Sequence, residues 1–167
     1  MKQTFFTLLA LVLGAGLVFF RAPAFAQDKG SIELTSIAEV EAKEFNSEGR
    51  QVTVRKPAGK VVPGNEVIYT TTYVNIGKAP AENVAITNPV PEHMIYKDNS
   101  AAGENTTIVF SIDGGKTYKS PDALVVTLAD GTKRPAAASD YTHIRWTLNK
   151  SLSPGGKGFV TYRAILK

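Results

Sequence analysis

Val62 to Gly77, with the sequence VPGNEVIYTTTYVNIG, is the stretch that decides the fold of this chain. It opens with a Pro-Gly turn, in which Pro63 presets its own φ and Gly64 supplies a positive φ. The residues that follow are rich in β-branched and aromatic side chains, which favour a packed and pleated strand. We therefore predict that this stretch forms a central strand of a β-sandwich.

Alternating apolar and polar residues and frequent turn residues predict about eight to ten short strands along the rest of the chain. This pattern indicates an all-β, immunoglobulin-like β-sandwich. The segment Asn88–Pro91 is expected to leave the sheet, because proline cannot donate a hydrogen bond to a neighbouring strand. Residues 98–105 and 132–141 are expected to be surface loops. Besides the central stretch, the expected strands cover residues 31–43, 51–55, 82–87, 94–96, 107–112, 124–128, 141–148 and 158–166.

The first 26 residues have the features of a secretory signal peptide. Lys2 gives a positive start, residues 5–20 are almost uninterruptedly apolar, and Ala24-Phe25-Ala26 is a small-x-small cleavage motif. A retained membrane anchor is the alternative, but 16 apolar residues are fewer than the roughly 20 that span a bilayer. We expect cleavage before Gln27, a secreted or periplasmic protein, and no stable membrane anchor after cleavage.

Residues 27–167 are expected to form a single domain. They number 141, which suits one hydrophobic core. Without Lys2 and Arg21 they carry 17 basic and 15 acidic residues, a net charge of +2 that does not favour nucleic-acid binding. The chain has no cysteine, which excludes disulfides, thiol catalysis and Cys-ligated metals. Its stability must therefore come from the packed core.

Residues 31–56 form a predicted β-hairpin around the turn Asn46–Gly49. Its apolar face must be covered, because a free hairpin is at best marginally stable in water. The hairpin either joins the sandwich of its own chain or is donated to a neighbouring molecule. We favour the first, because residues 56–60 give only a short connection to the central strand. The face consists of Ile32, Leu34, Ala38, Val40, Val52 and Val54.

Several segments of the second part, residues 61–166, match a family pattern in a fixed order. The chain resembles a widespread domain family of bacterial surface proteins, catalogued as domain of unknown function number eleven. The resemblance implies an immunoglobulin-like building block of exported proteins and no catalytic residues. The family often has Asp where Asn88 stands, and it commonly occurs in tandem, whereas this chain has one copy. The matching segments are Val62–Tyr69, Tyr73–Gly77, Ala81–Val84 with Thr87–Pro91, and Trp146–Leu148 with Leu152–Gly155.

Ser111–Tyr118 looks like an Asp-box, S-x-D-x-G-x-T-aromatic, with Tyr in place of the usual Trp. In such a motif the Asp113 carboxylate accepts backbone N–H groups across a tight turn. A glycan-active propeller blade is the functional interpretation, but a propeller needs several blades of four strands each. A bound calcium would need further carboxylates in an ordered spacing, which the sequence lacks. We interpret the motif as a hairpin turn.

Other candidates for chemistry are few. His93 with Met94, and His143, could hold copper, but the spacing of known ligand sets is missing. Ser139 and Asp140 near His143 suggest a triad, but no G-x-S-x-G elbow presents the serine. We therefore predict no catalytic, cofactor-binding or metal-binding residues and no enzymatic activity.

Two further hypotheses concern pairs and groups of residues. An internal Lys–Asn cross-link would use Lys60 or Lys157 with Asn75 or Asn88, and the sequence leaves it open. A glycan-binding face would need three exposed aromatic side chains on one surface; the candidates are Tyr96, Tyr118, Tyr141 and Tyr162.

The function that we expect is a non-enzymatic exported module, structural or protein-binding, associated with the cell envelope. Its partner is an envelope protein or a second copy of the chain. The alternative is a glycan- or metal-binding sandwich, and the sequence identifies neither the ligand nor the oligomeric state.

The signal-peptide interpretation predicts that the exported protein begins at Gln27. Intact mass spectrometry of protein recovered outside the cytoplasm measures this directly. A mass that still includes residues 1–26 would contradict the interpretation.

Overall fold

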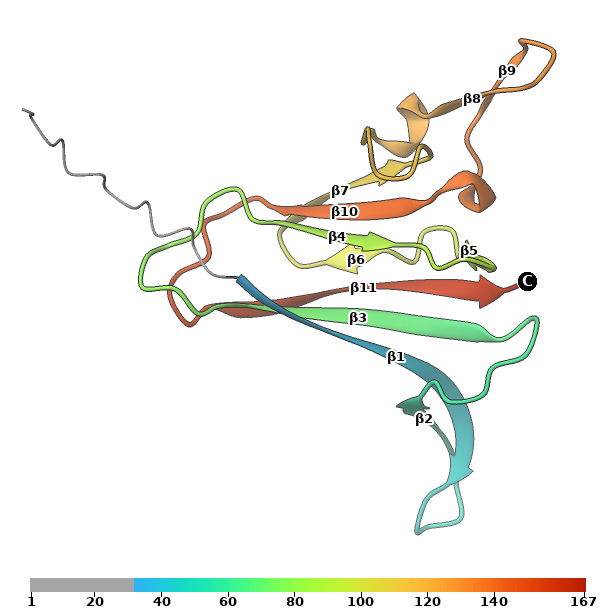
Figure 1. Cartoon of the computed structure of the whole chain (residues 1–167). Helices are drawn as coiled ribbons and strands as arrows, with labels where there is room; N and C mark the ends of the chain where they lie inside the picture. Colours follow the sequence, from blue (N-terminus) through green and yellow to red (C-terminus); the bar gives the residue numbers. More distant parts are fainter. Residues whose placement is uncertain (1–31) are drawn as a thin grey trace, which may run out of the picture.

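The computed structural model describes residues 32–167 as an all-β sandwich, as the sequence predicts (Figure 1). The expected signal peptide and the cleavage position lie outside the described residues. The described part contains eleven strands and two single-turn 3-10 helices. None of the helices in this part is long and apolar enough to cross a membrane.

The larger layer, which we call the wide sheet, is antiparallel and has six strands. Its order is β2-β1-β3-β11-β5, and β6 also pairs with β11. The strands are β1 (Ile32–Phe45), β2 (Gln51–Pro57), β3 (Glu66–Asn75), β5 (Met94–Tyr96), β6 (Ala102–Gly103) and β11 (Lys157–Leu166).

The opposing layer, the narrow sheet, has only three strands in the order β4-β10-β7. They are β4 (Ala85–Pro89), β7 (Thr106–Ser111) and β10 (His143–Leu148). A separate hairpin of β8 (Val125–Thr127) and β9 (Lys133–Pro135) follows the short helix η1 (Pro121–Ala123) and precedes η2 (Ala138–Asp140). Because the two layers differ in width, the outermost strands of the wide sheet have no partner layer above them.

The stretch that opens the sequence analysis is the central strand of the wide sheet, as predicted. β3 pairs along its length with β1 on one side and β11 on the other. Gly64 has a positive φ of 88°, as the preceding Pro-Gly turn requires. At the other end of β3, the buried Asn75 amide donates to the carbonyls of Ala79 and Leu152 and accepts from the Gly77 N–H. This side chain therefore holds the strand end against the following loops.

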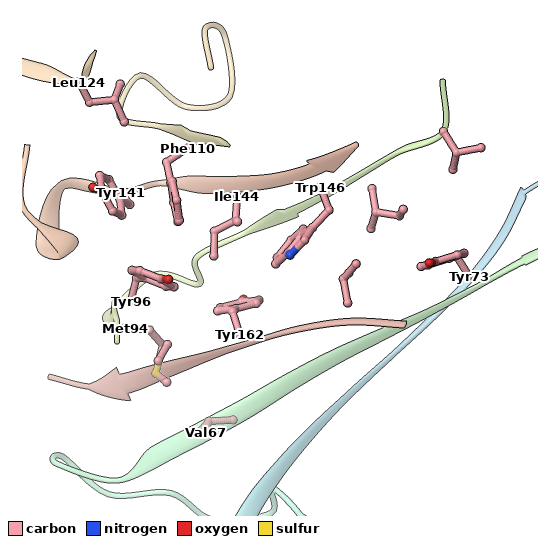
Figure 2. Close-up of a cluster of buried hydrophobic side chains, with 14 of the residues drawn as sticks. Val67, Tyr73, Met94, Tyr96, Phe110, Leu124, Tyr141, Ile144, Trp146 and Tyr162 are labelled. Atoms are coloured by element: carbon pink, nitrogen blue, oxygen red, sulfur yellow. The ribbon is translucent and has the colours of Figure 1, made fainter. Parts of the chain in front are cut away.

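The core lies between the two sheets and is centred on Trp146 of β10. Trp146 and Tyr162 face each other with ring centroids 6.2 Å apart, and both are almost fully buried (Figure 2). Tyr162 also stacks on Tyr69 and donates its hydroxyl hydrogen to the carbonyl of Pro89, 2.8 Å away. Trp146 is therefore a core residue, fully shielded from solvent.

The N-terminal hairpin docks onto its own chain, as we expected. Ile32–Glu39 of β1 pair with β3, and Glu39–Phe45 pair with β2. The expectation that its whole apolar face is covered is wrong, because Leu34 is 50% exposed. Leu34 lies opposite Tyr73 and points toward the narrow sheet, but that sheet ends at β4, one strand short of β1.

Three local expectations need correction. Asn88 and Pro89 stay in the narrow sheet, because β4 is an edge strand on which the missing N–H of proline faces no neighbour. The expected loops 98–105 and 132–141 contain the short strands β6 and β9, respectively. β6 pairs with β11, which is distant in sequence, and β9 pairs with β8 across an irregular turn. The alternation of apolar and polar residues within each segment therefore could not indicate a strand.

The indole nitrogen of Trp146 generates a prediction about stability. Among residues 32–167 it is the one buried side-chain nitrogen or oxygen without a hydrogen-bond partner. Replacing Trp146 with Ala should cost about 3–5 kcal/mol, whereas Trp146→Phe should cost less than about 2 kcal/mol because it also removes an unsatisfied donor. Urea unfolding followed by far-UV circular dichroism measures both values. Equal losses in the two variants would contradict this account.

Candidate functional site

The Asp-box segment is a closed turn held by one carboxylate. The Asp113 carboxylate accepts hydrogen bonds from the backbone N–H groups of Lys116 and Thr117 and from two hydroxyls, Ser111 Oγ and Thr117 Oγ1, at 2.6–3.0 Å. Gly114 and Gly115 have φ values of 75° and 83°, which the turn requires. The turn returns the chain to pair Phe110 with Lys119, so the hairpin interpretation is confirmed.

These hydrogen bonds act on the ionisation of Asp113. They lower the pKa of Asp113 well below its ordinary value. The bond from the Thr117 hydroxyl contributes most, and the bonds from the Thr117 N–H and the Ser111 hydroxyl come next. Every described partner of the carboxylate belongs to the same turn. The arrangement is therefore that of a structural turn whose acid stays ionised.

The residues of the suspected triad are not brought together. Asp140 forms a two-pronged ion pair with Arg134, with nitrogen–oxygen distances of 2.6 and 2.9 Å. His143 instead lies at the start of β10, where its Nδ1 is 3.2 Å from Thr142 Oγ1. Ser139 lies in the single-turn helix η2. Asp140 therefore orients the β9–η2 connection and does not orient an imidazole.

The two histidines lie in different elements of the fold, His93 in a loop and His143 at the start of β10. His93 has an exposed side chain in the loop between β4 and β5, and it has a positive φ of 65°. Met94, its neighbour, is buried in the core. In the part of the chain that the structure describes, no three His, Cys, Asp or Glu side chains gather closely enough to hold a metal ion.

The cross-link candidates have other partners. Asn75 is held as described above, and the amide nitrogen of Asn88 donates to Thr71 Oγ1 across the two sheets at 2.8 Å. Between residues 32 and 167, neither Lys60 nor Lys157 makes a hydrogen bond to these amides. The cross-link stays a hypothesis, because the bond itself is a question of chemical modification.

Three of the four candidate tyrosines for a glycan surface are buried. Tyr96 and Tyr141 pack with Phe110 in an aromatic cluster, with ring centroids 4.5–5.7 Å apart, and Tyr162 packs on Trp146. Tyr118 remains at the surface, where the guanidinium of Arg145 lies 3.6 Å from its ring centroid. These four residues therefore do not form a stacking surface.

A charged pocket of about 380 Å³ is lined by residues of β1, β3 and β11, next to the point where the β1–β2 hairpin leaves β3. Arg163 of β11 pairs with Glu41 of β1 and Glu66 of β3, and Lys97 also pairs with Glu66 at 2.6 Å. The hydrogen bonds from Lys97 and then Arg163 lower the pKa of Glu66. This network joins three strands and the β5–β6 loop, and it fixes the position at which β1 curves away from β3.

An apolar groove of about 620 Å³ lies at the end of the sandwich where β10 turns into β11. We call it the β10–β11 groove. Tyr73 lies across Gly158, and a Cβ at position 158 would collide with its phenol. Phe159, which is 60% exposed, forms part of one wall. The further lining residues used below are Glu104, Lys150, Leu152 and Lys157.

The sequence analysis missed the Arg163 network and the groove. Arg163 lies 122 residues after Glu41 in sequence, so only the strand order brings the two together. The groove combines residues from β3, β10, β11 and the β6–β7 turn. The single sequence signal for it was Gly158 at the start of a strand, since glycine in a strand often marks a close approach of another group.

The Asp113 turn generates a prediction about pH. Because its pKa is lowered in the folded protein, the carboxylate stabilises the fold above its unfolded-state pKa, about 3.9, and this contribution is lost as the pH falls below that value. Asp113→Asn should therefore lower the free energy of unfolding at pH 7, and the gap to wild type should narrow by pH 3. Urea titrations at both pH values measure this. Asp98→Asn is the control, because among residues 32–167 Asp98 accepts only a local N–H from Asn99. A gap between Asp113→Asn and wild type that is the same at both pH values would contradict the prediction.

Comparisons with known proteins add no assignment. No family model matches the chain, and neither a curated protein nor a solved structure is similar to it. The resemblance to the bacterial surface-domain family therefore stays a prediction that depends on the segments quoted above.

Proposed function

We propose that this protein is a non-enzymatic exported module that binds an extended segment of another cell-envelope protein by strand addition. The supporting observation is the open edge of β1 at residues 32–37. This segment pairs with β3 on one side, whereas its pairing with β2 begins only at Glu39. The open edge thus offers backbone N–H and C=O groups to a further strand.

The side chains along the open edge suit such a partner. Leu34 and Ile37 are 50% and 51% exposed and point to opposite faces of the wide sheet. Natural proteins protect exposed edges with charged residues, proline or a bulge, whereas residues 32–37 contain no lysine or proline and only one charge, that of Glu33. An added strand would cover both side chains if it carried apolar residues on both of its faces, one beside Leu34 and one beside Ile37.

The width of the two sheets also supports this proposal. Asn88 of β4 reaches Thr71 of β3, which places the edge of the narrow sheet above β3 and leaves β1 beyond it. The space above Leu34 is therefore open to a side chain of the partner. The polar groups that could have done chemistry, including Asp113, Asp140 and Asn75, are engaged in holding turns and loops.

The experiment places a photoactivatable cross-linking amino acid at Thr35, on the open edge, in the full chain expressed in its native cells. We expect a covalent adduct to an envelope protein, and the linked peptide, identified by mass spectrometry, should be an extended segment with apolar residues on both faces. The double variant Leu34→Lys/Ile37→Lys should reduce the adduct at least about tenfold, because charges on an edge oppose strand pairing.

The matched control carries the same cross-linker at Glu82, an exposed position in the loop between β3 and β4. Far-UV circular dichroism checks that the lysine variant stays folded, which we expect because both positions are half-exposed. Equal adducts from positions 35 and 82, or an adduct that survives the two lysines, would overturn the proposal.

A further inference from the structure

We infer that this protein assembles head to tail, with Phe45 at the tip of the β1–β2 hairpin of one copy inserted into the β10–β11 groove of the next copy. This contact uses neither the open edge of β1 nor the envelope partner proposed above. It would join identical chains in a row.

Phe45 is the projecting part of this contact. It is the last residue of β1, at the tip of a hairpin that curves away from β3 and from the narrow sheet (Figure 1). Its side chain is 73% exposed, the most of any large hydrophobic residue in the described chain. The Asn46 side chain closes the turn next to it by accepting the N–H groups of Glu48 and Arg50. The phenyl ring is therefore presented on an ordered turn.

The β10–β11 groove is the receiving part. Its volume of about 620 Å³ exceeds that of one phenyl ring, and Leu152 and Phe159 give it apolar walls. A glycan site would favour several exposed aromatic rings, but Phe159 is the exposed aromatic here while Tyr73 is only 5% exposed. The groove is therefore better suited to an apolar protein side chain.

The two parts lie at opposite ends of the wide sheet. The hairpin leaves β3 at the pair Glu39–Ile68, whereas the groove lies beside the pairs Phe159–Thr72 and Lys157–Val74. The projecting and receiving parts are thus well separated on one molecule. A contact between two different patches of identical chains repeats from copy to copy and produces an open filament or a ring.

The charges around the two parts are complementary. Glu44 and Glu48 flank Phe45 and pair only with Lys56 and Arg50 of the same exposed hairpin. Such exposed pairs contribute little to stability, so exchanging them for a partner's lysines costs little. Lys150 and Lys157 line the groove and form no ion pair with any residue between 32 and 167. Glu104 also lines the groove, so the groove offers two free cations and one carboxylate near its apolar walls, an excess of one positive charge.

The test uses purified chain from Gln27 to Lys167 and measures mass against concentration by sedimentation velocity. Wild type should form species larger than a monomer as its concentration rises toward about 1 mM. Phe45→Ser removes the projecting ring, and Phe159→Glu places a repelling charge in the groove. Each variant should lower the association constant at least about tenfold. Both positions are exposed, so both variants should stay folded.

Mixing the two variants gives the decisive result. Phe45→Ser retains an intact groove and Phe159→Glu retains an intact Phe45, so an equal mixture should form dimers and nothing larger. Val125→Ser is the control, because it removes a half-exposed apolar side chain from the separate β8–β9 hairpin and should assemble like wild type. High salt should weaken the association, because it screens the glutamate–lysine contacts.

A wild type that remains monomeric throughout would overturn the inference, and so would a Phe45→Ser variant that assembles unchanged or a mixture that fails to dimerise. A monomeric wild type that binds an oligosaccharide, with loss of binding in Phe159→Glu, would assign the groove to glycan instead. Because only purified chain is present, these results are independent of the envelope partner proposed for the open edge.

Discussion

The contact between Trp146 and Tyr162 is the interaction on which the rest of the structure depends. The chain has no cysteine, so no disulfide joins the two sheets. The attachment of one layer to the other therefore depends on apolar burial, on these two rings above all, and on a few hydrogen bonds across the gap. The Tyr162 hydroxyl donates to Pro89 and the Asn88 amide donates to Thr71, and each bond fixes β4 over the wide sheet. Burial holds the layers together, while these polar groups set their lateral position.

The unequal width of the layers explains where the molecule presents apolar surface. A three-stranded layer covers only part of a six-stranded one, so β1 and β2 extend past the shared core. Leu34 has the sequence pattern of a hairpin core residue, yet it remains exposed because no second layer reaches it. On the outer face of the wide sheet, Arg163 secures β1 to its neighbours by pairing with glutamates of β1 and β3. Ion pairing thus replaces burial where the sandwich is one layer thick.

The sequence predicted features that depend on local chemistry. Alternation located most of the strands, the Pro-Gly pair located the turn at Gly64, and the residue spacing around Asp113 predicted its closed turn. It did not predict features that depend on which strands are neighbours. The exposure of Leu34 follows from the number of strands in the opposing sheet, and the β10–β11 groove follows from Tyr73 lying over Gly158 on a strand far away in sequence. Pro89 was misjudged for the same reason, because the tolerance of a strand for proline depends on whether it lies at an edge.

The pairing of β3 with both β1 and β11 has a mechanical consequence. β1 and β11 both run antiparallel to β3 and begin at the same end of it, with Ile32 opposite Asn75 and Lys157 opposite Val74. β1 thus starts at one end of the wide sheet, and β11 finishes at the other, where Ala164 lies opposite Val67. Tension applied between these two points acts along the strands, so the hydrogen bonds of both ladders share the load in shear instead of opening one after another.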